Sequence, residues 1–377
     1  MAHAPAKAPA DFEHVRASVQ LTCVPGVGPR LRQLLLERFG TPEAVFAARF
    51  DEILAVDRIG KEIAEAIFAM ANDPTADGII ELCRSRDVGI ISEASEGYPG
   101  LLSHIPDPPG VLFVRGELKP CDAMAIAIVG ARHATAYGLR VAEQLGSSLA
   151  HAGYTIVSGL ARGIDAAAHR GALAAGGRTI AVLGSGVLNI YPPEHGDLAT
   201  EIIGCGAVIS EAPPFAEPFR GAFPQRNRIV SGLSLGVVVV QASDRSGALI
   251  TARMAGEQGR EVFAVPGAID CRMSRGCHQL IRDGATLVGG VDDILEELGP
   301  LFETATDPDG RLIKNPAELQ LTTLERHVLD AVCDEPIGID GIVESTSLAV
   351  SQVLATIGVL EMRRLVRRLP GNRVQRT

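Results

Sequence analysis

The sequence predicts an α/β protein with a Rossmann-like, mostly parallel sheet and helices on both faces. A small N-terminal helical domain and a C-terminal winged-helix domain are expected to flank it. Over residues 124–288, short apolar runs alternate with helical patterns, which is typical of βαβ units. Several of these runs are apolar throughout, as expected for parallel strands covered on both faces. The 377 residues are also long for one domain.

The N-terminal segment, residues 12–75, is predicted to form short helices after a disordered, Ala/Pro-rich start at residues 1–11. Two glycine turns precede apolar helical patterns, as in helix-hairpin-helix motifs: Val24-Pro25-Gly26-Val27-Gly28 and the weaker Val56-Asp57-Arg58-Ile59-Gly60. Glycine lets backbone N–H groups at a helix start face a phosphate. DNA contact and a purely structural packing role are both open for these turns.

The middle segment, residues 76–303, is predicted as the extended Rossmann-like domain. Residues 89–118 contain four prolines and are expected to lead into the sheet as an extended chain. Strands are predicted at residues 126–129, 155–157, 179–183, 207–209, 236–240, 261–265 and 286–288. Doubly wound sheets bind ligands at the carboxyl ends of their strands, so the loops that follow these strands are the expected site.

The C-terminal segment, residues 317–377, follows a polar linker at residues 304–316. Thr322 and Glu325 have the spacing of a capping box that opens a helix. Further helical patterns lead to two short strands around Pro370-Gly371-Asn372, and helices followed by a hairpin indicate a winged helix. This end of the chain is basic, with Arg363, Arg364, Arg367, Arg368, Arg373 and Arg376.

Composition narrows the function classes. The net charge of −10 argues against coating DNA through global charge, although a local basic groove is compatible with it. Only 4% of the residues are aromatic and there is no Trp, so large stacking platforms are not expected to be the main binding device. The 7 scattered cysteines suit a reducing compartment, and Cys271 and Cys277 are expected to be free thiols. No apolar stretch reaches the roughly 18 residues of a membrane span, so a cytoplasmic location is expected.

Glycine-rich loops follow three predicted strands, where the backbone can approach a ligand and helix N-termini favour anions. Arginines gather at the same strand ends, and guanidinium groups suit phosphate oxygens. The predicted anion-binding residues are Gly130, Arg132, Ser158, Gly159, Arg162, Gly184, Ser185, Gly186, Arg226, Asn227, Arg228, Arg245, Ser246 and Gly247. Pairing of some arginines with Asp165 or Glu211 is the structural alternative, and His169, His195 and His278 are expected to be structural or rim residues.

Other chemistries fit less well. A dinucleotide site needs G-x-G-x-x-G and an acidic residue closing the second strand, but Ala131-Arg132 follows Gly130, and the second strand ends in Ser158-Gly159. Residues 232–236 match G-x-S-x-G, yet a helical pattern precedes Ser234 and a strand follows it, the reverse of a nucleophile elbow. No P-loop pattern occurs. The remaining interpretation is a protein surface that binds the phosphate backbone of a nucleic acid.

Taken in order, these loops closely resemble the DNA-processing protein A family, also called Smf, over roughly residues 89–290. The matching stretches are Ile128-Val129-Gly130-Ala131-Arg132, Ser158-Gly159-Leu160-Ala161-Arg162-Gly163-Ile164-Asp165, Val182-Leu183-Gly184-Ser185-Gly186, Ile209-Ser210-Glu211, Phe223-Pro224-Gln225-Arg226-Asn227-Arg228, Ser246-Gly247-Ala248-Leu249-Ile250-Thr251, Val265-Pro266-Gly267 and Gly276-Cys277-His278-Gln279. An N-terminal helical, SAM-like domain and a C-terminal winged helix also fit the family.

The resemblance implies a non-enzymatic protein without a cofactor that binds single-stranded DNA in a basic pocket of the Rossmann-like domain. It also implies a homodimer formed through that domain and a role in protecting incoming DNA and loading the recombinase RecA during natural transformation. Two positions depart from the family pattern: Arg245 stands where lysine is common, and His278 where Asn often follows Gly-Cys. The alternative is a nucleotide-binding or nucleotide-hydrolysing enzyme of the related lysine-decarboxylase-like fold. The Pro-Gly-Gly-x-Gly-Thr loop of that fold is interrupted here by Ala268.

Overall fold

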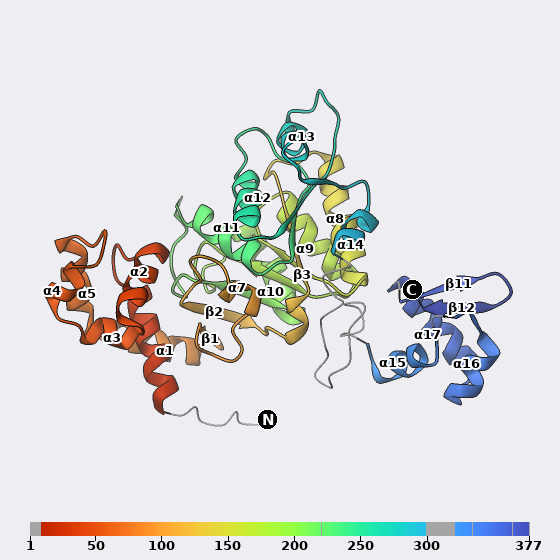
Figure 1. The fold of residues 1–377 in the computed structure, drawn as a ribbon, viewed down its shortest axis with the longest axis horizontal. Helices are drawn as coiled ribbons and strands as arrows, with labels where there is room; N and C mark the ends of the chain where they lie inside the picture. The colour runs from red at the N-terminus through yellow and green to blue at the C-terminus, as the bar shows by residue number, and fades with distance from the viewer. Residues whose placement is uncertain (1–8, 220, 299–320, 334, 364, 377) are drawn as a thin grey trace.

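The computed structural model describes residues 9–219, 221–298, 321–333, 335–363 and 365–376 (Figure 1). The predicted linker at residues 304–316, Arg364 and the first eight residues lie outside these ranges. Helix α1 (Pro9–Thr22) begins within residues 1–11, the segment predicted to be disordered. The predicted boundary between that segment and the first helix therefore lies too far along the chain. Pro9 occupies the first helical position, where proline is favoured.

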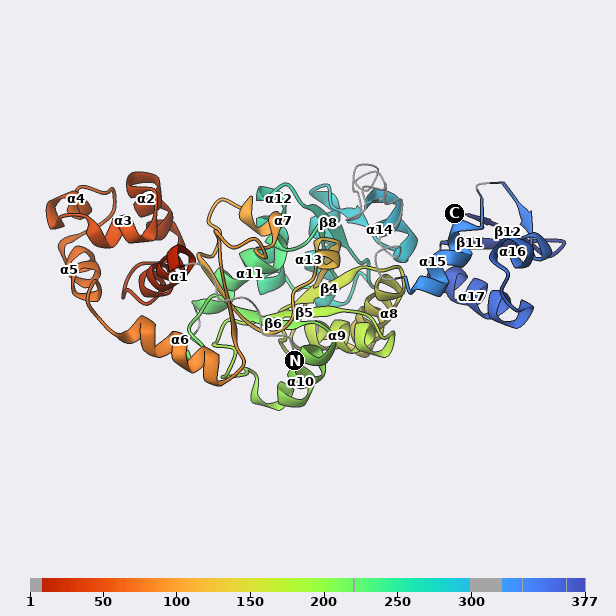
Figure 2. The same ribbon diagram turned by 90° about the horizontal axis from the view of Figure 1, so that it is seen from below.

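Short helices form the N-terminal segment, as predicted: α2 (Pro29–Phe39), α3 (Pro42–Ala47), α4 (Phe50–Leu54), α5 (Lys61–Met70) and α6 (Thr75–Ser85). Gly26 adopts a φ of +85° in the turn before α2, a conformation that favours glycine. Helices α1 and α6 pack on the central sheet, because Val19 and Ala76 share an apolar core with the strand residue Phe113. The helical segment is therefore anchored to the sheet beside it (Figures 1 and 2).

The central sheet has nine strands in the order β1-β2-β6-β5-β4-β3-β7-β8-β9. The seven predicted strands are all present to within one residue at each end: β3 (Ala125–Val129), β4 (Thr155–Ser158), β5 (Thr179–Val182), β6 (Ala207–Ser210), β7 (Gly236–Val239), β8 (Glu261–Ala264) and β9 (Thr286–Leu287). Neighbouring strands from β6 to β9 pair in parallel. The chain runs outward from β3 to β6 and then returns to place β7 on the other side of β3. The switch point of the fold therefore lies between β3 and β7.

The segment at residues 89–118 was wrongly predicted to be only an extended lead-in. It forms β1 (Gly89–Ser92), helix α7 (Gly100–Ser103) and β2 (Val111–Gly116), and β2 pairs antiparallel with both β1 and β6. The prolines lie in the connection between the two strands, where no ladder hydrogen bond is lost. The four apolar residues that open β2 are all buried. Together β1 and β2 extend one edge of the parallel sheet.

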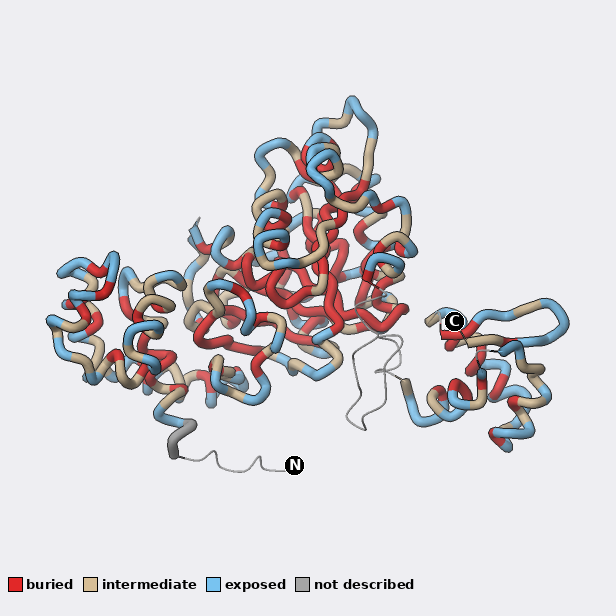
Figure 3. The backbone as a smooth tube through the Cα atoms, in the orientation of Figure 1, coloured by how far each residue is buried: buried red, intermediate tan, exposed pale blue. Residues whose placement is uncertain are grey.

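Helices cover both faces of the sheet: α8 (Ala136–His151), α9 (Ile164–Ala174), α10 (Gly196–Cys205), α11 (Ala222–Gly232), α12 (Gly247–Glu257), α13 (Arg275–Arg282) and α14 (Val291–Leu298). Ala127 and Val129 of β3 share a core with α11 and α12, whereas Ile126 and Ile128 share a core with α8 and α9. This alternation follows from the two-residue period of a strand. Figure 2 shows the two helix layers, and Figure 3 shows the buried strands between them.

The C-terminal segment is a winged helix, as predicted: α15 (Thr323–Asp330), β10 (Ile337–Gly338), α16 (Ile339–Thr346), α17 (Val350–Met362), β11 (Val366–Leu369) and β12 (Arg373–Arg376). The capping box is confirmed, since the N–H of Glu325 donates to the Thr322 hydroxyl at 3.3 Å and the Thr322 N–H donates to the Glu325 carboxylate at 2.7 Å. Strand β10, not predicted, joins the hairpin in a three-stranded sheet.

Among the described residues, no single helix is long and apolar enough to cross a membrane. One pair of helices, α16 and α17, meets the length and composition requirement only when taken together, and the two are bent by 112°.

Candidate functional site

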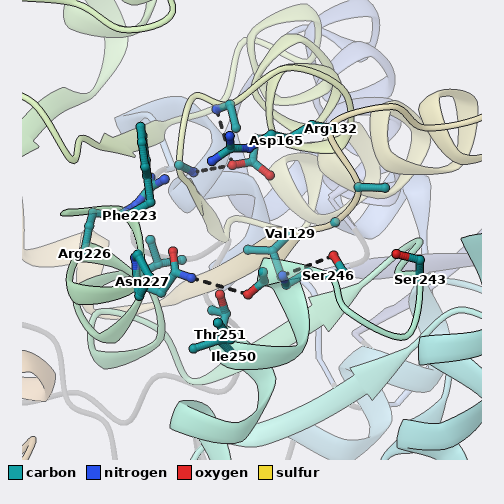
Figure 4. Close-up of a pocket in the computed structure, with 18 of the residues that line it drawn as sticks. Val129, Arg132, Asp165, Phe223, Arg226, Asn227, Ser243, Ser246, Ile250 and Thr251 are labelled. Atoms are coloured by element: carbon teal, nitrogen blue, oxygen red, sulfur yellow. Dashed lines mark hydrogen bonds between the residues drawn. The ribbon is translucent and has the colours of Figure 1, made fainter. Parts of the chain in front are cut away.

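A cavity of about 570 Å³ opens at the carboxyl ends of β3 and β4 and is closed by the first turns of α11 and α12. We call it the switch-point cavity, because it lies where the strand order reverses. Figure 4 shows Phe223, Arg226 and Asn227 of α11 on one side and Ser246 and Thr251 on another. Two of the three predicted glycine-rich loops, those after β3 and β4, therefore converge at this cavity, and the loop after β5 does not line it.

Half of the predicted residues line this cavity, and half lie elsewhere. The lining residues are Gly130, Arg132, Gly159, Arg226, Asn227, Ser246 and Gly247. The residues outside it are Ser158, Arg162, Gly184, Ser185, Gly186, Arg228 and Arg245. The predicted strand ends are confirmed, but whether a side chain at such an end lines the cavity depends on its tertiary contacts.

Arg132 is an exposed cation at the rim of the cavity. Its guanidinium carbon lies 4.9 Å from the centroid of the Phe223 ring, within the range of a cation–π contact. Tyr191 lies beside the same ring, with the two centroids 5.8 Å apart. Phe223 and Tyr191 were not predicted as site residues, since a low aromatic content had argued against stacking. The motif that contains Phe223 was the signal that could have identified it.

Arg226 forms a buried wall of the same cavity, with 6% of its surface exposed. One of its guanidinium nitrogens donates to the Val182 carbonyl. Burial lowers its pKa to about 10, with Asp165 acting in the opposite direction, so the side chain stays protonated at neutral pH. The guanidinium lies against Gly159, where an added Cβ would stand 2.5 Å from its Cζ. Glycine is required at position 159, because the Arg226 guanidinium occupies the space that a side chain there would need.

Asp165 holds the loop after β4 in place. Its carboxylate accepts the N–H groups of Gly159 at 3.1 Å and Ala161 at 3.3 Å. Burial raises the pKa of this carboxyl, and the nearby Arg226 and the two N–H donors counteract that shift. Asp165 lines the cavity, but its observed contacts are those of a residue that fixes backbone and balances Arg226.

Gln241 fixes the loop after β3 and was not predicted. Its carbonyl oxygen accepts the Thr135 N–H at 2.9 Å, and its amide nitrogen donates to the Thr135 hydroxyl at 2.9 Å. Its backbone carbonyl accepts the Ala131 N–H at 2.8 Å. A Cβ on Gly138 would lie 2.5 Å from the Gln241 Cδ, so that glycine makes room for the amide. The buried Gln241 joins the β3 loop to the end of β7.

Two of the three remaining predicted arginines, Arg228 of α11 and Arg162 of the loop after β4, are ion-paired. The Arg228 guanidinium, 4% exposed, donates to the Glu211 carboxylate at 2.7 Å and lies 3.5 Å from Asp107. This confirms the expected structural alternative of pairing with Glu211. Arg162 forms an exposed pair with Glu194. Arg245 differs from both, since it is exposed in the loop before α12 and forms no ion pair within the described part of the chain.

The remaining predicted residues shape the backbone. The Ser158 hydroxyl donates to the Ile128 carbonyl at 2.6 Å, and the Ser185 hydroxyl donates to the Asn189 carbonyl at 2.7 Å. A Cβ on Gly186 would collide with the backbone carbonyls of Pro213 and Pro214. Gly184 lines a second, smaller cavity beside α11. These four residues therefore position neighbouring segments and do not line the switch-point cavity.

Helix α12 begins at the cavity. The Ser246 side chain accepts the Ala248 N–H at 3.3 Å and caps the helix, and the cavity is lined here by Gly247, whose missing side chain leaves the first turn open. The positive end of a helix favours negative charge. Across the cavity, the Asn227 amide donates to the Gly247 carbonyl at 3.4 Å.

The histidines that the sequence placed in structural roles do have structural contacts. Nδ1 of the fully buried His169 is 2.7 Å from the Thr179 hydroxyl, and burial lowers the His169 pKa to about 3, with the charge of Arg226 contributing. His195 and His278 bond to the carbonyls of Leu160 at 2.8 Å and Gly267 at 3.0 Å. All three therefore serve the fold.

No metal centre or hydrolase elbow is found among the described residues. No group of three or more His, Cys, Asp or Glu side chains in those ranges could hold a metal ion. Cys277 is buried, and burial raises its pKa to about 11. The predicted turn at Ser234 is confirmed, since it follows α11 and precedes β7, and its buried hydroxyl donates to the Val230 carbonyl.

Comparison with known protein families gives a match for each of the three segments of the chain. Residues 89–299 match the family described as DNA recombination-mediator protein A, residues 313–372 match the DprA winged helix domain, and residues 21–80 match a helix-hairpin-helix motif. Protein Smf of Synechocystis is 36% identical over 94% of this chain and 96% of its own length. Protein Smf of Escherichia coli is 42% identical over 76% of this chain and 77% of its own length.

Two solved structures are similar as well. DNA processing protein A of Streptococcus pneumoniae matches with a TM-score of 0.65 and 34% identity, over 74% of this chain and 95% of its own. DNA processing protein A of Helicobacter pylori, described as having a single-stranded DNA binding mode, matches with a TM-score of 0.51 and 30% identity, over 56% of this chain and 95% of its own. The extent of these matches and the shared order of domains leave one assignment: this chain belongs to the DNA-processing protein A family, the DprA/Smf proteins.

Proposed function

We propose that this protein binds single-stranded DNA by its phosphate backbone in the switch-point cavity. The observation that carries the proposal is the charge arrangement there. Arg132 is exposed at the rim, Arg226 is protonated in the wall, and the positive end of α12 faces the same space. Asp165 is the carboxylate in the lining, and its Oδ2 atom already accepts two backbone N–H groups. The cavity therefore favours an anion.

The geometry supports a nucleic-acid backbone over a dinucleotide. Strand β4 ends in Ser158, whose hydroxyl is turned to a neighbouring strand, so no acidic side chain stands there to hold a ribose. The stacked Arg132 and Phe223 offer a cation and a ring at one position. A phosphate and its neighbouring base can use both together. The single-stranded state is supported by the binding mode described for the Helicobacter pylori relative.

The remaining roles follow from family membership. We propose that the protein acts without catalysis or a cofactor in the cytoplasm, as a homodimer formed through the Rossmann-like domain. There it would protect incoming DNA and load RecA in natural transformation or recombination. The name of a relative, which refers to DNA processing, and the description of the matched family, which refers to recombination mediation, support this role. Arg228 and Arg162 have ion-pair partners, so we propose that Arg132, Arg226 and the exposed Arg245 carry the DNA contacts.

A salt titration tests the binding mode. Oligo(dT) affinity is measured for the wild type and for Arg132→Ala, with Arg253→Ala as the matched control, because Arg253 is an exposed arginine of α12 outside the cavity. Loss of one phosphate contact is expected to weaken binding and to reduce the slope of log affinity against log salt by about 0.7. The control should bind as the wild type. Equal binding by Arg132→Ala and the control at low salt would refute the site, and release of ribose phosphate from nucleoside monophosphates would favour the enzyme alternative.

A further inference from the structure

The loop between β6 and α11 holds two phenylalanines out in solvent. This segment, residues 211–219, is here called the aromatic loop. Phe215 is 52% exposed and Phe219 is 58% exposed. The loop is nine residues long and also carries three prolines. Single exposed apolar residues are ordinary, but two aromatic rings on one short loop beside a ligand cavity call for a partner.

The aromatic loop is held firmly in place. The N–H of Gly186 donates to the Ala216 carbonyl at 2.9 Å, and the N–H of Leu188 donates to the Pro214 carbonyl at 2.8 Å. A side chain at Gly186 would collide with the loop, so the glycine permits this close approach. Each proline fixes its own φ. The glycine-rich segment after β5, residues 184–186, does not line the switch-point cavity, and it serves instead to hold the aromatic loop.

The aromatic loop continues directly into the proposed DNA site. Phe219 lines a second cavity of about 190 Å³, and Arg226 lines both that cavity and the switch-point cavity. Phe219 precedes Phe223, the ring under Arg132, by four residues. An extended chain spans at most about 3.6 Å per residue, so the Cα atoms of Phe219 and Phe223 are no more than about 14 Å apart. A strand leaving the switch-point cavity over the start of α11 would reach Phe219.

We propose that Phe215 and Phe219 are base-stacking residues for the DNA segment next to the one in the switch-point cavity. The proposal rests on the proposed function, and it adds a second, uncharged contact region. Rings on a rigid loop lose little conformational freedom when a base stacks on them, and any base can stack on an aromatic ring. The phosphates are then held at Arg132 and Arg226, and the bases that follow lie on the aromatic loop.

The experiment compares rings with apolar side chains of another shape. The double variant Phe215→Leu/Phe219→Leu keeps the loop apolar and removes the rings, and Phe215→Tyr/Phe219→Tyr retains them. Phe68→Leu is the matched control, since Phe68 is 54% exposed on α5. Binding is measured for oligo(dT) of increasing length and for an abasic strand of equal length, with melting temperatures to confirm folding. The Arg132→Ala variant is included as the marker of the cavity itself.

The Leu variant is expected to bind long oligo(dT) at least about fivefold more weakly for each ring that stacks. Its affinity for the shortest oligo(dT) that fits the cavity should equal that of the wild type. Its affinity for the abasic strand should also equal that of the wild type. The Tyr variant and the Phe68 control should bind as the wild type. If Arg132→Ala loses affinity while the Leu variant does not at any length, stacking is refuted and the proposed function stands. An equal loss on abasic DNA also refutes stacking. Absence of binding by the wild type refutes both.

Discussion

Replacing Gly159 by alanine tests whether the cavity is built around a buried guanidinium. The new Cβ would stand 2.5 Å from the Cζ of Arg226. Arg226 is only 6% exposed, and it is held by the Val182 carbonyl, so it cannot move into open solvent without losing that bond. Loss of a hydrogen bond from a charged group costs about 1.5–3 kcal/mol. Overpacking adds about 1–3 kcal/mol. We expect a loss of stability of about 3 kcal/mol.

For a domain of this size, about 3 kcal/mol corresponds to a fall in melting temperature of roughly 6–12 °C. Thermal unfolding followed by circular dichroism measures it, with Gly204→Ala as the control. Gly204 lies in α10, and a Cβ added there would meet open space, so alanine should be neutral or stabilising. Oligo(dT) affinity should fall together with the melting temperature only for the Gly159 variant. A Gly159→Ala protein that melts within about 2 °C of the wild type, less than the fall expected from overpacking alone, would refute the assigned packing.

Other changes test separate contacts. Arg228→Ala leaves the Glu211 carboxylate without its buried partner and should destabilise by about 3–5 kcal/mol in urea unfolding, whereas oligo(dT) affinity of the folded fraction should not change. His169 has a folded pKa of about 3, below its ordinary 6.5, so its contribution to stability is complete above pH 6.5 and is lost as the pH falls toward 3. Between pH 7 and 5 the wild type should lose about 2 kcal/mol more than His169→Leu. Thr322→Ala should lower the stability of the winged helix by about 1 kcal/mol, measured by hydrogen exchange in α15, and an unchanged exchange rate would argue against the capping box.

The sequence was most informative where a pattern extends over many residues. The apolar runs at β3 to β9 have one simple explanation, burial between two helix layers, and their positions were predicted to within a residue. The β1 and β2 strands were missed because prolines dominate the segment between them, although those prolines lie outside the ladders. A local sequence pattern can indicate a helix or strand, but it does not show where a proline-rich connection ends and the next strand begins.

Side-chain direction at the site could not be predicted in the same way. Arg226 and Arg228 are two residues apart on one helix and look equivalent in sequence, yet one lines the cavity and the other pairs with Glu211. Gln241 follows four valines and carries no motif, and its role emerges only when the β3 loop is placed beside it. Such contacts depend on tertiary neighbours, and periodicity contains no information about them.

The bonds between Gln241 and Thr135 join positions 106 residues apart in the chain. Contacts of such long sequence separation form late in folding, after nearby strands have paired. A chain emerging from the ribosome can assemble β3 to β6 before β7 has been made, but that intermediate has no completed cavity. The proposed capacity to hold DNA would therefore arise only once β7 and α12 have been made, and chains truncated before these elements would not compete with the finished protein for strands.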